Sequence, residues 1–298
     1  MNFEELLKAK VSEADKITDG FLPLSGRFNS ELTEAMNYSV RAGGKRLRPV
    51  IMMSFYRLFG GSGKVVEPFM AAMEMLHTYS LVHDDLPAID NDDYRRGVYT
   101  THKKYGEALA VLAGDGLLHQ AYETAVKAFD YEADNDNVIK ALRIFADKTG
   151  VNGMLGGQAA DVVNTGKIID DDLMYYIYEH KTGALIEGSM MIGAALAGAD
   201  DDCIETVRKT GSLIGLAFQI KDDLLDIYGS EKALGKPVNS DSRNNKKTYV
   251  TVNGKDKSQA DILRFTEEAV SLLDTVGGNE EERIFLRQLF KYLTSRNS

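Results

Sequence analysis

Residues 67–90 read EPFMAAMEMLHTYSLVHDDLPAID, an apolar stretch that ends in three aspartates. Apolar side chains fall on every side of a helix along most of this stretch, which predicts a helix buried by neighbours all around. Asp84, Asp85 and Asp90 therefore stand at the end of a buried surface rather than on a solvated tail. Because buried like charges are costly without a compensating cation, this arrangement indicates a site for divalent metal ions.

A second aspartate cluster, Asp222-Asp223-Leu224-Leu225-Asp226, follows another apolar helical stretch. Its first and last aspartates are four residues apart, so a regular helix places them on one face. Asp84 and Asp90 are six apart, and we expect Pro87 to disturb the helix and let the chain bend Asp90 back toward Asp84. Mg²⁺ suits such clusters, because it takes one or two carboxylates and completes its coordination with water and phosphate oxygens. The two clusters predict an enzyme that handles diphosphates; a solvated acidic helix end is the competing interpretation of each.

The composition favours one large all-α domain that spans residues 1–298. The chain has only 5 prolines, and helix-forming residues recur throughout with no linker-like segment. Residues 248–254 have strand and turn character, but without a second strand we interpret them as a loop. We expect a many-helix bundle, with buried helices at 67–83, 108–129, 184–199 and 212–228 and an amphipathic outer layer at 28–41, 137–150, 259–274 and 282–294.

Charge and composition exclude several classes of protein. The net charge of −10 argues against a general binder of nucleic acid or of anionic membranes. The single cysteine, Cys203, excludes an internal disulfide framework. The acidic N-terminus lacks the pattern of a signal peptide and no apolar run has the length of a membrane span, so we expect a cytoplasmic protein.

Basic residues accompany the acidic motifs, as an acidic protein that binds diphosphates requires. In the segment Gly43–Pro49 (GGKRLRP), glycine ends one helix and proline opens the next. Lys45 and Arg48 therefore lie near a helix N-terminus, which favours anions. Arg95 and Arg96 follow the first motif, and arginine forks match pairs of diphosphate oxygens. Taken alone, each basic cluster has a solvated surface as its competing interpretation. Further candidate donors are Lys181, Thr182, Lys236 and Lys247.

Several segments together resemble the motifs of the trans-prenyl diphosphate synthase family, most closely its bacterial short-chain members. In the family's order and spacing they are Gly43–Pro49, His77–Gly97, Gly156–Asp161, His180–Gly183, Phe218–Asp226 and Gly235-Lys236. Two aspartate motifs combined with GGKRLRP form a specific signature, and the similarity covers nearly the whole chain. The resemblance implies an all-α bundle of about a dozen helices around a deep central cavity, assembled as a homodimer.

Carried over by position, the resemblance implies a role for each candidate residue. About three Mg²⁺ ions would bind together with an allylic diphosphate. Their main ligands would be Asp84, Asp90 and Asp222, with Asp85 and Asp226 in lesser roles. The allylic diphosphate would contact Arg95, Lys181, Thr182, Gln219, Lys236 and Lys247. Isopentenyl diphosphate would bind without metal to Lys45, Arg48, His77 and Arg96. The catalytic candidates are Asp84, Asp90, Asp222, Arg95 and Lys181.

Two positions depart from the family pattern. Lys221 places a positive charge directly before Asp222, where many relatives have glutamine. Lys246 and Lys247 compete for one role, and we prefer Lys247 because it immediately precedes Thr248.

The implied reaction is the head-to-tail condensation of isopentenyl diphosphate with dimethylallyl and then geranyl diphosphate, which gives farnesyl diphosphate. The allylic C–O bond ionises, and the double bond of isopentenyl diphosphate attacks the cation in a site that excludes water. The resemblance also implies that a bulky residue below the first motif forms a floor that sets product length. In the bacterial short-chain enzymes that the chain resembles, an aromatic residue at the position of Tyr79, here beside the small Ser80, accompanies a fifteen-carbon product, so we expect farnesyl diphosphate. A purely structural role in the core is the competing interpretation of Tyr79.

A geranylgeranyl diphosphate synthase, a terpene cyclase and a non-catalytic subunit are the alternative functions. The aspartate-rich second motif and the basic pair Lys45 and Arg48 disfavour a cyclase, and the intact aspartate motifs disfavour a non-catalytic subunit. A calcium-binding protein is disfavoured because no loop has the alternating ligands that such sites use.

Overall fold

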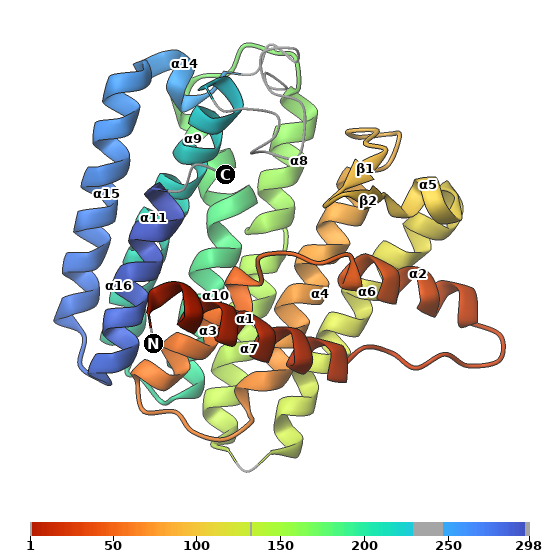
Figure 1. Ribbon diagram of the computed structural model, residues 1–298, viewed down its shortest axis with the longest axis horizontal. Helices are drawn as coiled ribbons and strands as arrows, with labels where there is room; N and C mark the ends of the chain where they lie inside the picture. The colour runs from red at the N-terminus through yellow and green to blue at the C-terminus, as the bar shows by residue number, and fades with distance from the viewer. Residues whose placement is uncertain (1, 132, 229–246, 296–298) are drawn as a thin grey trace. The chain divides into compact units, whose positions relative to one another are not determined.

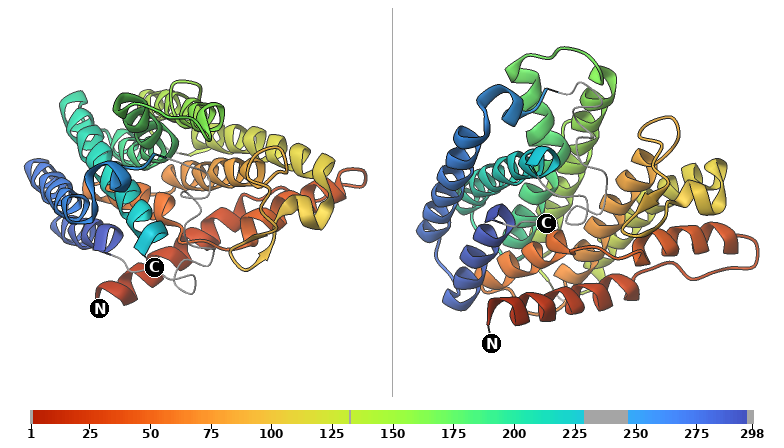
Figure 2. Two further views of the ribbon diagram at one scale, coloured as in Figure 1. Left: turned by 90° about the horizontal axis from the view of Figure 1, so that it is seen from above. Right: turned by 45° about the horizontal axis from the view of Figure 1, so that its top comes forward.

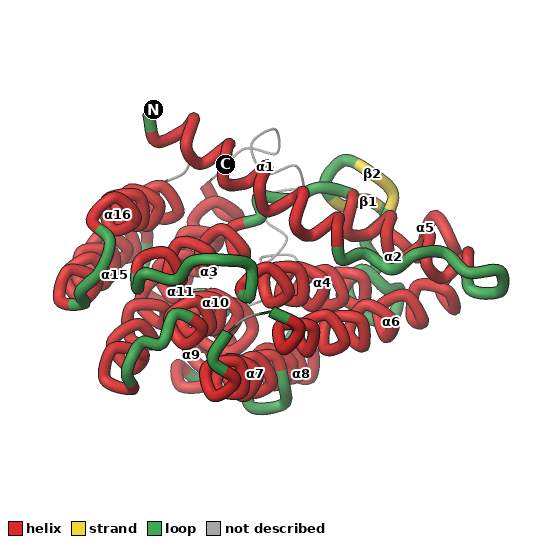
Figure 3. Tube along the Cα trace, turned by 90° about the horizontal axis from the view of Figure 1, so that it is seen from below, coloured by secondary structure: helices red, strands yellow, loops and turns green. Residues whose placement is uncertain are grey.

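The computed structural model describes residues 2–131, 133–228 and 247–295, and most of them are helical. Figure 3 shows helices joined by loops, with one short pair of strands in the described chain. The predicted all-α class is confirmed. Contacts divide the chain into two compact units, the first made of residues 1–53 and 63–138 and the second of residues 54–62 and 139–298. The single domain over residues 1–298 stays a prediction.

The first unit is built around α4 (Val66–Asp84), which is buried along almost its whole length. The all-round burial predicted for residues 67–83 is therefore confirmed. α4 packs against α6 (Glu107–Val126), and Figure 1 shows the two helices side by side. α1 (Phe3–Gly20) and α2 (Ser30–Arg41) also pack against α4. The unit further contains α5 (Thr101–Tyr105), the 3₁₀ turn η1 (Lys127–Asp130) and the strands β1 (Tyr94–Arg95) and β2 (Val98–Tyr99).

Helix α6 departs from the prediction that residues 108–129 are buried on every side. Val111, Leu112, Tyr122 and Val126 expose large apolar side chains, and Leu112 is 54% exposed. The other side of the helix, which includes Leu117, is buried. The apolar pattern was identified correctly, but a sequence pattern does not show whether the covering surface belongs to the same chain.

The second unit contains the long helix α11 (Asp201–Tyr228), which packs against α10 (Ala184–Leu196) and α15 (Lys255–Thr275). Figure 2 shows α15, in blue, next to α11, in cyan. α10 is buried along its whole length but one residue, as predicted for residues 184–199. The unit also contains α8 (Met154–Asn164), α9 (Asp171–Ile177), the π-helical turn η2 (Tyr178–Gly183), α14 (Tyr249–Asn253) and α16 (Glu280–Ser295).

Two more helices, α3 (Leu47–Leu58) and α7 (Asn135–Thr149), begin with residues of the first unit and end with residues of the second. The helices predicted for the outer layer are present as α2, α7, α15 and α16, and each has both buried and exposed residues. Within the described residues, no helix combines the length and the apolar character that a membrane crossing needs.

Residues 249–253 form the short helix α14, with Thr248 and Gly254 as its caps, so the loop predicted for residues 248–254 is wrong. The Thr248 hydroxyl accepts a hydrogen bond from the backbone N–H of Thr251 at 3.3 Å, and the Thr251 hydroxyl accepts one from the N–H of Thr248 at 2.9 Å. Gly254, with φ of 76°, adopts the left-handed conformation that ends the helix. These end contacts outweigh the strand preference of the β-branched residues between them.

Candidate active site

The first aspartate motif lies where α4 ends. The backbone N–H of Asp90 donates to the carbonyl oxygen of Asp84 at 2.9 Å. The backbone N–H of Asn91 donates to the carbonyl oxygen of Leu86 at 3.1 Å. These bonds close a turn across Pro87 and return Asp90 to the end of the helix, which confirms the predicted bend. Asp84 is half-buried and Asp90 is exposed, so both side chains are accessible from solvent.

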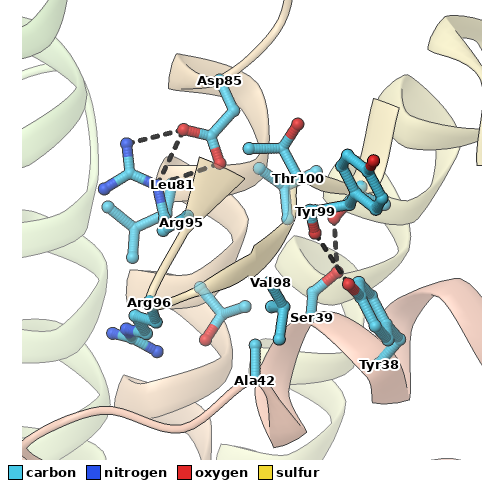
Figure 4. Close-up of a pocket in the computed structure, with 13 residues that line it drawn as sticks. Tyr38, Ser39, Ala42, Leu81, Asp85, Arg95, Arg96, Val98, Tyr99 and Thr100 are labelled. Atoms are coloured by element: carbon cyan, nitrogen blue, oxygen red, sulfur yellow. Dashed lines mark hydrogen bonds and ion pairs between the residues drawn. The ribbon is translucent and has the colours of Figure 1, made fainter. Parts of the chain in front are cut away.

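Asp85, the second aspartate of this motif, is held by Arg95. Its side chain is buried, at 3% exposure, and accepts hydrogen bonds from the Arg95 Nε at 2.7 and 2.9 Å. The Arg95 Nη2 also lies 2.6 Å from Asp85 Oδ1, and Figure 4 shows the guanidinium facing the carboxylate. Burial raises the pKa of Asp85, and the positive charge of Arg95 opposes that rise. Arg95, predicted to bind diphosphate, thus has a carboxylate partner in this structure.

Arg95 and Arg96 lie on a β-hairpin that sequence analysis did not predict. β1 and β2 pair antiparallel, with Arg95 opposite Val98. The turn residues Arg96 and Gly97 have φ of 54° and 81°, as a type I′ turn requires. A glycine turn between two β-forming residues was the available signal. The pocket drawn in Figure 4 is lined by Asp85, both arginines of the hairpin and residues of α2.

The GGKRLRP segment is anchored by Arg46, which sequence analysis did not single out. Its guanidinium donates to Asp15 and Glu74, both at 2.6 Å, and to the carbonyl oxygen of Val40 at 2.7 Å. Arg46 and Glu74 are 5% and 2% exposed, so they form a buried ion pair between the segment and α4. Burial would lower the pKa of Arg46, but the charges of Glu74 and Asp15 outweigh it and the pKa is raised. An arginine flanked by other basic residues gives no sequence signal of such burial.

His77 lies half-buried on α4 in a strongly positive region. Burial lowers the pKa of His77 well below its usual value, and nearby positive charges lower it further, those of Arg48, Arg96, Arg95 and Arg46. The Arg96 guanidinium packs on Gly44, where an added Cβ would lie 2.8 Å from Cζ, and donates to the carbonyl of Gly43. Lys45 is exposed on the same turn. The structure thus groups the predicted ligands of isopentenyl diphosphate in the first unit.

Tyr79, the predicted floor residue, is 7% exposed on α4. Its ring meets that of His83 edge-on, with 5.2 Å between the centroids. Burial and then the charge of Asp84 raise the pKa of the Tyr79 phenol, so the ring lies near the first motif. The neighbouring Ser80 turns its hydroxyl back to the carbonyl oxygen of His77 at 2.8 Å. These contacts fit a floor or a core role, and the floor stays a prediction.

The second motif lies on α11 in the second unit. Asp222 is half-buried, and Asp226, one helical turn later, is buried. Lys221, the departure from the family pattern, is half-buried. Among the residues that the structure describes, no three His, Cys, Asp or Glu side chains gather into a metal site of their own.

Asp223 is the buried centre of the second motif. Its carboxylate accepts hydrogen bonds from the Tyr178 hydroxyl and from the Gln219 side-chain amide, the latter at 3.1 Å. The Gln219 oxygen accepts in turn from the Thr182 hydroxyl at 2.7 Å. Two predicted contacts of the allylic diphosphate, Thr182 and Gln219, are therefore brought together.

Lys181 and Thr182 lie in the π-helical turn η2. The Lys181 Nζ is 2.6 Å from the carboxylate of Asp161 on α8. α8 approaches so closely that a Cβ on Gly157 would lie 2.2 Å from the backbone nitrogen of Lys181. Such π turns inside helices are frequent at functional sites. The Lys-Thr pair could be identified from the sequence, but the π turn could not. The π turn packs against residues of other elements, and the local sequence does not show these contacts.

Two predicted ligands of the allylic diphosphate remain, Lys247 and Lys236, and the structure describes only Lys247. The Lys247 Nζ lies 2.8 Å from Asp171 and donates to the carbonyl oxygen of Ile169 at 2.9 Å. Lys236 lies outside the described residues. Each base predicted for the allylic diphosphate that the structure does describe thus contacts a carboxylate: Arg95, Lys181 and Lys247.

A family model for polyprenyl synthetases matches residues 29–281. The chain belongs to the polyprenyl synthetase family. The predicted family is thereby confirmed. Among relatives, the farnesyl diphosphate synthase of Geobacillus stearothermophilus is 46% identical over 220 residues, 74% of each chain. The geranylgeranyl pyrophosphate synthase of Catharanthus roseus is 43% identical over 80% of this chain and 67% of its own. Among solved structures, an FPP/GFPP synthase from Zymomonas mobilis is similar with a TM-score of 0.86 at 30% identity, covering 98% of this chain and 99% of its own.

Proposed function

We propose that this polyprenyl synthetase condenses isopentenyl diphosphate with dimethylallyl and then geranyl diphosphate to give farnesyl diphosphate. The proposal rests on one observation, the pair of aspartate motifs. Basic side chains accompany these motifs and form ion pairs with carboxylates in this structure. Relatives named farnesyl diphosphate synthase support the product, because they recur at 36% to 46% identity.

The donor atoms of both motifs fit Mg²⁺. The turn after α4 returns Asp90 to Asp84, and Asp222 and Asp226 lie one turn apart on α11. We assign Asp84, Asp90 and Asp222 as the main ligands of about three Mg²⁺ ions, with Asp226 in a lesser role; water and diphosphate oxygens would fill the other positions. Asp85 has a lesser role, because an arginine already holds its carboxylate. When bound, Mg²⁺ would neutralise negative charge on the departing diphosphate.

The allylic diphosphate is assigned to the bases that contact carboxylates and to their neighbours. Arginine donates paired hydrogen bonds to phosphate oxygens, and lysine acts as a point charge. As the allylic C–O bond breaks, the diphosphate takes the bonding electrons, and these donors stabilise the charge that develops. The assigned residues are Arg95, Lys181, Thr182, Gln219, Lys236 and Lys247.

Isopentenyl diphosphate is assigned to Lys45, Arg48, His77 and Arg96. Because its pKa is lowered, His77 is neutral near pH 7 and contributes a hydrogen bond without charge. The double bond held there attacks the allylic carbon, and the departing diphosphate accepts the proton that the intermediate loses. The apolar residues along α4 exclude water, which would otherwise capture the cation as an alcohol.

Farnesyl diphosphate is the proposed product because Tyr79 places a bulky ring on α4, below the first motif. Tyr79 lies five residues before Asp84, about 7.5 Å along the helix. Geranylgeranyl diphosphate is the alternative product, because a relative of that name is nearly as similar.

We also propose that the enzyme is a cytoplasmic homodimer. The exposed apolar side of α6, formed by Leu112, Tyr122 and Val126, has the character of a surface that a second copy covers. The net charge of −10 disfavours a nucleic-acid partner.

One experiment tests the proposed activity. The purified protein is incubated with Mg²⁺, isopentenyl diphosphate and dimethylallyl, geranyl or farnesyl diphosphate, and the dephosphorylated products are separated by chromatography. We expect farnesol as the main product from the first two allylic substrates, and none when a chelator is in excess. Turnover in the chelator contradicts the role of Mg²⁺, and accumulation of geranylgeraniol supports the alternative product.

A further inference from the structure

A chain of hydrogen bonds, buried at Asp223 and Tyr178 and half-buried at Thr182 and Gln219, passes through the second aspartate motif. The Thr182 hydroxyl donates to Gln219 Oε1 at 2.7 Å, and Gln219 Nε2 donates to Asp223 Oδ1 at 3.1 Å. The Tyr178 hydroxyl donates to Asp223 Oδ2 and accepts from the backbone N–H of Tyr249 at 2.8 Å. The chain of bonds therefore links η2, α11 and the first residue of α14.

Burial makes these bonds necessary rather than incidental. Asp223 is 3% exposed and Tyr178 is 5% exposed. A carboxylate removed from water needs hydrogen bonds, and donors reach both of its oxygens here. The Tyr178 hydroxyl is donor and acceptor at once, a combination that a phenylalanine does not supply. Its ring is fixed in an apolar cluster that also contains Leu224 and Tyr249.

The chain of bonds begins at residues assigned to the allylic diphosphate and ends close in sequence to another. Thr182 and Gln219 form one end. At the other end, Lys247 is only two residues before Tyr249. The two residues in the middle, Asp223 and Tyr178, have no role in the assignments above.

We propose that Asp223 and Tyr178 are positioning residues that hold both groups of allylic-diphosphate ligands in register with the second aspartate motif. This inference rests on the proposed function of the site. The Asp223 carboxylate accepts hydrogen bonds from Gln219 and Tyr178, whereas Asp222 and Asp226 are the residues of this motif assigned to Mg²⁺. The bond to the amide of Tyr249 fixes where α14 starts and thereby the reach of the preceding lysine.

We call the hydrogen bond from the backbone N–H of Tyr249 to the Tyr178 hydroxyl the tether. Tyr178→Phe tests the tether in the absence of substrate. The variant keeps the ring in the apolar cluster and removes only the hydroxyl. Tyr176→Phe is the matched control, because the Tyr176 ring stacks on His180 with 4.0 Å between centroids and a phenylalanine preserves that contact. Hydrogen exchange of the full chain is followed by mass spectrometry. We expect residues 249–254 to exchange about three- to tenfold faster in Tyr178→Phe, and at the wild-type rate in the control. Unchanged exchange in Tyr178→Phe overturns the inference.

Kinetics then separate positioning from general damage. Tyr178→Phe should raise the KM for geranyl diphosphate about three- to tenfold, with the KM for isopentenyl diphosphate unchanged. Combined with Lys247→Ala, it should raise the KM less than the product of the two single effects, because both variants weaken one contact. Independent effects, or equal changes in both KM values, overturn the inference.

Asp223→Asn provides a second variant in case Tyr178→Phe does not fold. It should raise the KM for geranyl diphosphate without changing the Mg²⁺ concentration that gives half-maximal activity, whereas Asp222→Asn should raise that concentration. An equal Mg²⁺ requirement of the two variants would make Asp223 a metal ligand and overturn the inference. The exchange experiment needs no turnover, so an inactive wild-type protein contradicts the proposed function and leaves the tether to be decided by exchange.

Discussion

Individual basic side chains at this site are oriented by carboxylates on other elements of the fold. Asp85 fixes Arg95 through three contacts between 2.6 and 2.9 Å, and Asp161 fixes Lys181 at 2.6 Å. Such pairing limits the rotamers of long side chains before substrate arrives, which lowers the entropy lost on binding. The aspartate motifs were predictable because their chemistry is local in sequence. These partners were not, because each pair joins different elements.

The two diphosphate subsites should respond separately to substitution. Arg48→Ala should raise the KM for isopentenyl diphosphate roughly thirtyfold, since a lost charge-assisted hydrogen bond costs about 2 kcal/mol. Arg95→Ala should instead impair use of the allylic substrate. Initial rates with each substrate varied in turn measure both effects. Arg41→Ala is the control, because Arg41 forms an exposed pair with Asp19. A change in Arg48→Ala confined to the allylic KM would reverse the assignment.

His77 should make stability depend on pH. Its pKa in the folded protein is lowered well below the ordinary value of 6.5, first by burial and then by the arginines. Below about pH 6.5 the unfolded chain therefore binds a proton that the folded chain does not, and stability falls as the pH drops. As the pH falls below this value, the free energy of unfolding should decrease less in His77→Gln than in the wild type. The two slopes should differ by up to about 1.4 kcal/mol per pH unit. Urea denaturation at several pH values measures it. Parallel pH curves for the two proteins would contradict the lowered pKa.

Among the elements, the GGKRLRP turn is positioned by helices on either side of it rather than by its own sequence. Arg46 joins the turn to α1 through Asp15 and to α4 through Glu74. Glu74→Gln should lower the free energy of unfolding by about 3 kcal/mol, because a buried charge loses its partner. Asp19→Asn, which breaks an exposed pair, should cost less than about 1 kcal/mol. Thermal and urea unfolding compare the variants. Equal, small losses would show that the Arg46–Glu74 pair is not buried in solution.

Helix α4 should also determine product length through Tyr79. Tyr79→Ala removes a buried ring and should shift the products from farnesyl toward geranylgeranyl diphosphate. Tyr79→Phe keeps the ring and should leave the distribution unchanged. Chromatography of the dephosphorylated products compares the two variants with wild type. A distribution that does not lengthen in Tyr79→Ala would leave Tyr79 as a core aromatic only.

The elements that the sequence predicted well are long and periodic, and those it missed are short. The patterns at 137–150 and 282–294 closely match α7 (Asn135–Thr149) and α16 (Glu280–Ser295). The hairpin of β1 and β2, the π turn η2 and the helix α14 were missed. In these segments one glycine turn, one close helix contact or one capping threonine decides the conformation, and averaging over a window of residues hides each of them.

For the whole molecule, the proposed homodimer predicts that the exposed apolar side of α6 forms the contact between copies. Leu112 and Val126 are 54% and 52% exposed. If the proposed dimer forms through this surface, the double variant Leu112→Glu, Val126→Glu should place charges in the contact and yield a monomer. Light scattering coupled to size-exclusion chromatography measures the mass. Leu263→Glu is the control, because Leu263 is 64% exposed on α15. A dimeric double variant, or a monomeric wild type, would exclude this surface as the interface.

The carboxylates that hold Arg95, Lys181 and Lys247 act as built-in counter-ions, much as in an ion-exchange resin. A diphosphate that binds these bases therefore displaces one anion with another instead of entering an unscreened positive field. Under the proposed assignment, its affinity would be a difference between two ion pairings, which would keep binding reversible and let the inorganic diphosphate leave after turnover. Each displaced carboxylate would regain an uncompensated charge, and at Asp85 that charge would appear within the first aspartate motif, next to Asp84, which is assigned to Mg²⁺. Substrate and metal would then bind cooperatively. The diphosphate would free a carboxylate from its base, and the metal ion would compensate the negative charge of that carboxylate.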